Sequence, residues 1–215
     1  MNLLFLAISA LAAYLIGSIP VAYIFGRVLK GLDIREHGSG NMGATNAFRV
    51  LGKGPGTIVL ILDIVKGVIP VTLLANAFGL ADPLSLVIIA VAVVAGHNWP
   101  VFLGFKGGKG MATSLGVLIG LAIQFQVLRI ILLLVVMAWC AFFLLFGFVS
   151  LASIAAAVVF PILMVAFFEP FPLIIMSIVL CIFIVFRHRS NIKRLAKGQE
   201  NRVSFPFRKR PHLFL

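Results

Sequence analysis

The chain has 215 residues, of which 62% are hydrophobic and 11% are charged, and its mean hydropathy is +1.17. This balance excludes a water-soluble globular domain, which typically has about 25% charged residues. The net charge of +12 and the isoelectric point near 10.8 do not indicate nucleic-acid binding, because Lys and Arg are enriched in the cytoplasmic loops of membrane proteins.

Seven apolar runs predict transmembrane helices, since about 20 apolar residues cross a hydrocarbon core of about 30 Å. The runs cover residues 3–25, 56–78, 84–103, 111–127, 130–148, 151–168 and 171–186. The boundaries at 124–129 and at Ser150 are weak, so five longer crossings are the alternative. The first run has its basic flank, Arg27 and Lys30, after it and not before it. We therefore interpret it as a retained helix and not as a signal peptide.

The loops divide into a basic set and a nearly uncharged set. With seven crossings, one side receives residues 26–55, 104–110, 149–153 and everything after Phe186. The other side receives residues 76–82, 124–129 and 169–171, with Arg129 as the single cation. The positive-inside rule then predicts an N-terminus outside and a C-terminus in the cytoplasm. We expect an all-α polytopic bundle of seven transmembrane helices, with one domain at 1–200 and a basic cytoplasmic tail at 201–215.

The direction of the helices has a consequence for ligand binding. The second, fourth and sixth helices would begin on the cytoplasmic side and present their free N-terminal amides there. Helix N-termini favour anions, so we expect anion binding on this side.

A glycine-rich stretch, GSGNMGATN at residues 38–46, lies between the first two helices and is followed by Arg49. Its GxGxxG spacing does not indicate a dinucleotide site, because that motif needs a preceding strand in a βαβ unit. The glycines expose backbone amides and Arg49 offers a bidentate fork, so we interpret the stretch as a phosphate cradle. The alternative is a simple reversal between helices, with Arg49 as a cytoplasmic anchor.

A second glycine-rich stretch, AGHNWPVFLGFKGGKG at residues 95–110, joins the third and fourth helices. It fails the Walker pattern, because three residues and not four separate Gly104 from Gly108. Lys106 and Lys109 before a helix N-terminus form a candidate anion site, and a flexible loop with orientation charges is the alternative. His97 alone is more typical of a hydrogen-bonded interfacial residue than of a base.

Two further stretches add polar groups on the same side. VSLASI at residues 149–154 carries serines that alone indicate only capping or helix packing. RHRSNIKRL at residues 187–195 has four cations and one histidine, and binding to anionic lipid headgroups is the alternative to a role in a site. Asp63 and Lys66, one turn apart in the second helix, predict a buried pair, because unpaired charges at that depth are costly. No metal-ligand spacing surrounds the two cysteines, so we expect no metal site.

Together, GSGNMGATN with Arg49, LDIVKG at residues 62–67, AGHNWPVFLGFKGGKG, VSLASI and RHRSNIKRL resemble the bacterial acyl-phosphate glycerol-3-phosphate acyltransferase family, known as PlsY. The resemblance covers nearly the whole chain. It implies a multi-pass enzyme of the bacterial inner membrane whose active site faces the cytoplasm. Acyl phosphate and glycerol 3-phosphate would be its substrates and lysophosphatidic acid its product, in the first acylation of phospholipid synthesis. The resemblance also implies contact with membrane lipid, a soluble acyl-phosphate synthase as partner, and no cofactor.

Carried over to this sequence, the resemblance assigns catalytic positions to Ser39, Arg49, Lys109, Ser153, His188 and Asn191. It assigns substrate phosphate binding to Gly40, Asn41, Thr45, Asn46, Lys106, Gly107, Gly108 and Arg187. Acyl phosphate has a good leaving group, so the reaction needs positioning and charge neutralisation more than a covalent enzyme intermediate. His188 is one candidate proton acceptor, but neighbouring cations would lower its pKa, and the resemblance implies a substrate phosphate as acceptor instead.

Two other functions compete with this one. A transporter of a phosphorylated solute would also use glycine-rich loops and buried charges, but no inverted repeat is visible and the polar groups lie on one side. A membrane scaffold without catalytic activity predicts that the glycine-rich loops tolerate substitution.

Overall fold

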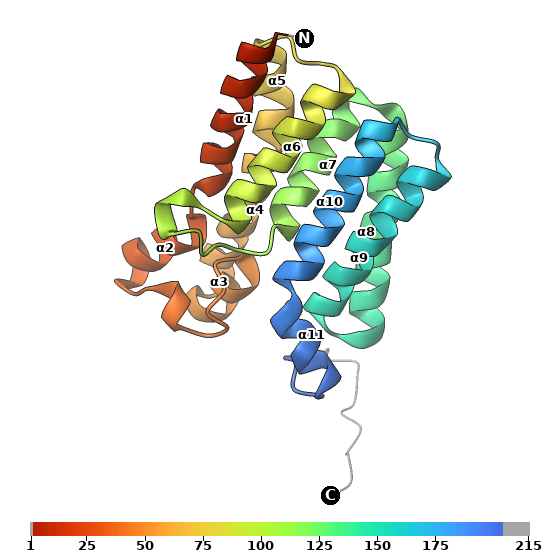
Figure 1. The fold of residues 1–215 in the computed structure, drawn as a ribbon. Helices are drawn as coiled ribbons and strands as arrows, with labels where there is room; N and C mark the ends of the chain where they lie inside the picture. Colours follow the sequence, from red (N-terminus) through yellow and green to blue (C-terminus); the bar gives the residue numbers. More distant parts are fainter. Residues whose placement is uncertain (1, 204–215) are drawn as a thin grey trace, which may run out of the picture.

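The computed structural model describes residues 2–203, and within them every regular element is helical. The longer helices are α1 (Leu3–Ser18), α4 (Lys53–Ile69), α6 (Pro83–Asn98), α7 (Met111–Gln124), α8 (Gln126–Phe146), α9 (Val149–Ala166) and α10 (Phe171–Arg187). The shorter ones are α2 (Val21–Lys30), α3 (Ala44–Leu51), α5 (Ala75–Ala77), α11 (Arg189–Ala196), the 3-10 turns η1 (Ile34–Glu36) and η3 (Val101–Leu103), and the π-helical turn η2 (Pro70–Leu74). The longer helices stand side by side in one bundle, with α2, α3 and α11 at one end (Figure 1).

Five segments of the described chain are long and apolar enough to cross a membrane: residues 3–30, 53–77, 83–103, 126–146 and 149–166. α10 and α11, which are bent by 58° at His188, make a sixth candidate when they are counted together. α7 has 14 residues, or about 21 Å of helix, and is shorter than a straight crossing needs. The chain is thus an integral membrane protein of the helical type.

Each predicted apolar run contains a helix, and the breaks between the runs have local causes. Pro20 divides the first run into α1 and α2, because proline cannot donate to the helical ladder. Phe125 is extended between α7 and α8, and Gly147 is left-handed at φ 77° between α8 and α9. A left-handed turn suits glycine, which ends helices without steric cost. The chain therefore breaks close to both boundaries that were weak in the sequence, instead of continuing through them.

Glycines let the bundle helices approach one another closely. A side chain at Gly17 of α1 would overlap the backbone of Val93 in α6, and one at Gly96 of α6 would overlap the backbone of α1. Gly116 packs in the same way against the backbone of Ile64 in α4. Close backbone approach at small residues is the usual mode of helix packing in membranes. The GxxxG pattern that begins at Gly116 thus packs helices within one chain.

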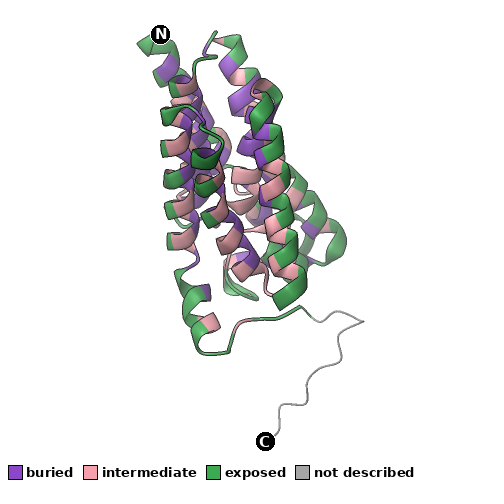
Figure 2. Cartoon of the chain, turned by 90° about the vertical axis from the view of Figure 1, so that its right-hand side faces the viewer, coloured by how far each residue is buried: buried purple, intermediate pink, exposed green. Residues whose placement is uncertain are grey.

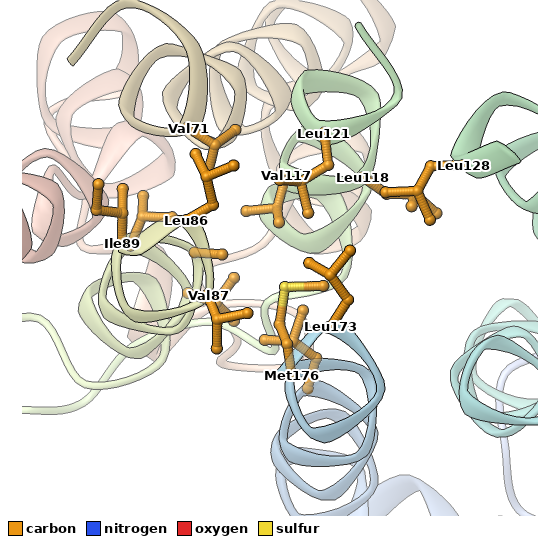
Figure 3. Close-up of a cluster of buried hydrophobic side chains, with 14 of the residues drawn as sticks. Val71, Leu86, Val87, Ile89, Val117, Leu118, Leu121, Leu128, Leu173 and Met176 are labelled. Carbon is orange, nitrogen blue, oxygen red and sulfur yellow. The ribbon is translucent and has the colours of Figure 1, made fainter. Parts of the chain in front are cut away.

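The main core lies in the centre of the bundle, and apolar side chains also cover its outside. Val71, Leu86, Val117, Leu121 and Met176 belong to this core, which joins η2 to α6, α7 and α10 (Figure 3). Buried residues face inward on the helices, and exposed residues form the outer surface (Figure 2). Many of these exposed side chains are Leu, Ile or Phe, which is the pattern expected where lipid surrounds a protein.

A second, smaller core supports the polar end of the bundle. It contains Val21, Ala22, Ile34, Met42, Ala44, Ala47, Leu51 and Val59. These residues come from α2, η1, the loop before α3, α3 itself and α4. The smaller core therefore fixes the loop at residues 31–43 and α3 onto the start of α4, beside the site described next.

Candidate active site

A cavity of about 780 Å³ opens among the polar loops and extends between the helices. All six residues that were assigned catalytic positions line it: Ser39, Arg49, Lys109, Ser153, His188 and Asn191. Three of the assigned phosphate-binding residues also line it, namely Asn41, Thr45 and Asn46. These residues are separated by up to about 150 positions in the sequence, so the fold brings the predicted motifs into one place. Their chemical roles remain predictions.

The first glycine-rich loop is shaped by Asn46, a buried residue of α3. Its Oδ1 accepts a hydrogen bond from the Ser39 amide at 2.8 Å, and its Nδ2 donates to the carbonyls of Ile34 and His37 at 3.2 and 3.0 Å. Gly40 has a φ of 68° and donates its amide to the same His37 carbonyl, outside the cavity lining. Asn46 and Gly40 therefore hold the loop, and Ser39 lies at its cavity side.

The second glycine-rich loop is held from two directions. The Gly108 amide donates to the carbonyl of His97 at 3.0 Å. The Arg187 guanidinium donates to the carbonyls of Gly108 and Gly107 at 2.8 and 2.5 Å. Arg187, Gly107 and Gly108 do not line the cavity, and Lys106 is exposed away from it. Arg187, Gly107 and Gly108 were assigned to phosphate binding, but their contacts show that they hold the loop in place. Lys106, which was assigned the same role, has no contact with the cavity.

Lys109 belongs to a hydrogen-bond network that is centred on Glu200. Its Nζ donates to Oδ1 of Asn191 at 2.5 Å, and Nδ2 of Asn191 donates to Oε1 of Glu200 at 2.6 Å. The same carboxylate accepts from Ser150 Oγ at 2.7 Å and from Arg194 Nε at 2.7 Å. Burial lowers the pKa of Lys109 to about 8, and the nearby Arg side chains add to this while Glu200 opposes it. Lys109 is therefore charged at neutral pH but close to losing its proton.

His188 lies at the bend between α10 and α11 and is 3% exposed. Its Nδ1 is 2.8 Å from the carbonyl oxygen of Ile184, so Nδ1 carries the proton and donates it. Burial, and then the charge of Lys109, lower the pKa of His188 to about 4. The imidazole is therefore neutral at working pH, with Nε2 as its hydrogen-bond acceptor.

Ser153 is already engaged on both sides of its hydroxyl. It donates to the carbonyl of Val149 at 2.8 Å and accepts from Trp139 Nε1 at 3.3 Å. Trp139 also lines the cavity and stacks on Phe143, with ring centroids 5.0 Å apart. The indole therefore fixes the position of Ser153 in the cavity lining.

The sequence-based assignment missed Glu200, Arg194, Ser150 and Trp139. Glu200 had a visible signal, because it is one of only six acidic residues in the chain and follows a basic run. The expected tail also begins inside the packed structure: Val203 donates its amide to the Gly147 carbonyl at 2.8 Å, and residues 201–203 line the cavity. The remainder of the expected tail, 204–215, lies outside the described residues. Residues 2–203 contain no group of three or more His, Cys, Asp and Glu placed to hold a metal ion.

Comparison with known proteins places this chain in a family. The model of the glycerol-3-phosphate acyltransferase family matches residues 7–198. A glycerol-3-phosphate acyltransferase of Synechococcus elongatus is 46% identical over 201 residues, which cover 90% of this chain and 92% of the relative. Glycerol-3-phosphate acyltransferase 2 of Moorella thermoacetica is 42% identical over 196 residues, which cover 91% of this chain and 96% of the relative.

Solved structures agree with these relatives. The crystal structure of PlsY (YgiH), described as an integral membrane glycerol 3-phosphate acyltransferase in its glycerol 3-phosphate form, is 40% identical and has a TM-score of 0.84. The match covers 93% of this chain and 96% of that one. The lysophosphatidic acid form of PlsY has a TM-score of 0.81 at 39% identity, over 93% of this chain and 95% of that one. The chain therefore belongs to the glycerol-3-phosphate acyltransferase family and is an integral membrane acyltransferase.

Proposed function

We propose that this enzyme transfers a fatty acyl group from acyl phosphate to glycerol 3-phosphate and releases lysophosphatidic acid and phosphate. The observation that carries the proposal is the division of the cavity into a cationic end and an apolar end. Arg49, Lys109 and Arg194 come from the polar loops and short helices and define the cationic end, and Leu60, Ile64, Leu115, Val135 and Val136 come from within α4, α7 and α8 and define the apolar end. An amphipathic donor with a phosphate head and an acyl chain matches this division.

The cationic end suits two phosphate groups held close together. The first residues of α4, α7 and α9 line the cavity, so three helix N-termini meet there, as the helix directions predicted. Their free amides and partial positive charge favour anions. Arg49 adds a planar fork and Lys109 adds a point charge, and both groups neutralise phosphate. Holding both substrates at one place removes most of the entropic barrier to their reaction.

The chemical step needs no covalent enzyme intermediate. The terminal hydroxyl oxygen of glycerol 3-phosphate attacks the acyl carbonyl carbon, the new ester bond forms, and the bond between the acyl carbon and the phosphate oxygen breaks. His188 is a weak base at a pKa of about 4, so it accepts a hydrogen bond from the hydroxyl and orients it. A phosphate oxygen of a substrate takes the proton. Asn191, which is bonded to Lys109, keeps the lysine directed at the leaving phosphate.

The membrane arrangement in this proposal is seven crossings of the bacterial inner membrane, with the N-terminus outside and the cavity facing the cytoplasm. α7 starts at the cavity, and Gln124 at its other end donates to the Val71 carbonyl at 2.7 Å, so the helix returns the chain through the bundle. α4 and α8 pack against this short helix, and a segment that does not reach the full depth of the membrane is tolerated where other protein surrounds it. The basic loops at the cavity end then obey the positive-inside rule. A soluble synthase would deliver acyl phosphate from this side.

The test is a reconstitution with purified protein. Palmitoyl phosphate is supplied with and without glycerol 3-phosphate, and both inorganic phosphate and lysophosphatidic acid are measured. We expect both products to appear at equal rates and only when both substrates are present. Acyl transfer from an acyl thioester, with palmitoyl phosphate inert, would refute the proposed donor and leave the acyltransferase assignment intact. Labelling of single cysteines introduced into the loops, in a variant that lacks Cys140 and Cys181, from each side of sealed vesicles tests the membrane orientation.

A further inference from the structure

Three ionisable residues that the proposed reaction does not use are packed together beneath the second glycine-rich loop. Lys66 Nζ lies 2.8 Å from Oδ1 of Asp63, and His97 Nδ1 lies 3.7 Å from the same oxygen. Lys66 also donates to the carbonyl of Ile19, at the break between α1 and α2, at 3.0 Å. The three side chains are at most 8% exposed. The cluster thus ties α1, α4 and α6 together at the level of the cavity.

His97 connects this cluster to the loop at residues 104–110 through its contacts with Gly108. Its carbonyl accepts the Gly108 amide, and its imidazole faces the Cα of Gly108 so closely that a Cβ atom there would overlap the ring, Nε2 first. Asp63 and His97 also line the cavity, whereas on the side away from it only about 10 Å³ is free beside His97, Lys66 and Gly108. A shift of the imidazole toward the loop would therefore displace Gly108, and with it the neighbouring Lys109.

We propose that His97, oriented by Asp63 and Lys66, is a positioning residue that sets the place of Gly108 and so directs Lys109 and the start of α7 into the cavity. The inference rests on the proposed role of Lys109 and α7 in phosphate binding. Because burial of one unpaired charge is far more costly than burial of a pair, Asp63 and Lys66 act as a unit that places one fixed carboxylate beside the His97 imidazole.

Gly107 provides a matched comparison for Gly108. A Cβ atom at Gly107 would overlap the backbone carbonyls of His97 and Asn98 and the ring of Pro100, and none of these is removed by trimming the His97 side chain. A Cβ atom at Gly108 would overlap only His97 side-chain atoms among its nearest neighbours. The two glycines are adjacent, so substitutions at them report on the same loop through different contacts.

The experiment is a pair of double-mutant cycles, read as the KM for glycerol 3-phosphate and as kcat of the purified enzyme. We expect His97→Ala, Gly108→Ala and Gly107→Ala each to raise KM several-fold, with a smaller change in kcat. In His97→Ala with Gly108→Ala, the combined rise should be much smaller than the product of the single effects, because the imidazole that obstructs the added methyl group is gone. In His97→Ala with Gly107→Ala, the single effects should multiply. Multiplication in both cycles would overturn the proposal, as would loss of kcat at unchanged KM in His97→Ala.

A charge-balanced variant keeps the test decisive if His97→Ala does not fold. Asp63→Leu with Lys66→Met removes both buried charges together, which cores tolerate better than the loss of one. We expect this variant to elute as folded protein on size exclusion, to retain kcat within a few-fold, and to have a raised KM for glycerol 3-phosphate. An unchanged KM would overturn the role of the pair. Lys109→Met distinguishes failure of the phosphate-binding role from failure of the positioning role. If Lys109→Met leaves activity unchanged, the phosphate-binding role of Lys109 is refuted. If Lys109→Met loses activity but the effects multiply in both double-mutant cycles, only the positioning role of His97 is refuted.

Discussion

We expect the charge of Lys109 to make the activity of this enzyme depend on pH in a specific direction. Its pKa is about 8 because burial and the neighbouring Arg side chains disfavour the ammonium form. With that pKa, only about 3% of the free enzyme keeps this charge at pH 9.5, since each pH unit above the pKa removes about tenfold. Above pH 8, kcat/KM for glycerol 3-phosphate should therefore fall by about tenfold per pH unit if the charged form binds phosphate.

The decrease in kcat/KM is limited by the free energy of one hydrogen bond between Lys109 and phosphate. A hydrogen bond to a charged group contributes about 1.5 to 3 kcal/mol, which corresponds to about 10- to 150-fold in kcat/KM. At neutral pH, kcat/KM of Lys109→Met should be lower than that of the wild type by this amount and should show no alkaline limb from this residue. The wild type should fall to the level of Lys109→Met at high pH. Lys106→Met, in the same loop but outside the cavity lining, should lose much less. The assay is release of phosphate from palmitoyl phosphate, corrected at each pH for hydrolysis without enzyme.

Lys109→Arg is the control that assigns the alkaline limb to this residue. Arginine stays charged throughout the range, so the variant should show a flat profile of kcat/KM between pH 7 and 10 even if its activity is reduced.

The stability of the folded protein should change in the opposite direction to its activity. The pKa of Lys109 is lower in the folded than in the unfolded state, so the unfolded state binds more protons between about pH 8 and 10.4. The free energy of unfolding should therefore increase as pH rises through this range. Relative to Lys109→Arg, the wild type should therefore lose activity and gain thermal stability above pH 8. A parallel alkaline limb in both proteins would refute the assignment.

Three further predictions test neighbouring parts of the structure. Glu200→Gln removes the charge that raises the pKa of Lys109, so the alkaline limb of kcat/KM should move to lower pH, and an unmoved limb would contradict the network. His188→Gln should lower kcat without changing the shape of the pH profile between pH 5.5 and 7.5, because a pKa of about 4 leaves His188 neutral in that range; an acidic limb that disappears in the variant would identify His188 as the base. Gly116→Leu should destabilise the folded protein by about 1 to 3 kcal/mol through overpacking against α4, seen as a lower unfolding temperature in detergent. Gly54→Ala, where nothing lies within 4 Å of the added atom, should not lower that temperature.

The elements of the fold could be predicted because their causes are local. Lipid imposes long apolar runs, and glycine marks a place where the helical ladder ends, as at Gly147. The grouping of the polar loops followed from charge and parity alone. The interruption of the first run at Pro20 and the π-helical turn that starts at Pro70 were missed, because an apolar run carries no mark of how a proline inside it is accommodated.

The contacts within the site could not be predicted because they join distant residues. Lys109 and Asn191 are 82 positions apart, and Ser150 and Glu200 are 50 apart. A resemblance between motifs names residues that gather, but it does not say which of them face the substrate. Arg187 is an example. Its charge and its place beside the glycine-rich loop led to its assignment to phosphate binding, but its guanidinium donates to two loop carbonyls instead.

The cations that line the cavity repel one another, and one carboxylate lies among them. Arg49, Lys109 and Arg194 line one cavity, and the neighbouring Arg side chains already lower the pKa of Lys109. The negative charge of Glu200 reduces this repulsion. Its carboxylate accepts a hydrogen bond from Arg194 and is connected to Lys109 through hydrogen bonds of Asn191. Hydrogen bonds from Asn191, Ser150 and Arg194 outweigh the cost of burial and hold the pKa of Glu200 below its usual range. One carboxylate thus offsets part of the repulsion among these cations, and in the proposed reaction the phosphates of the substrates would add further negative charge.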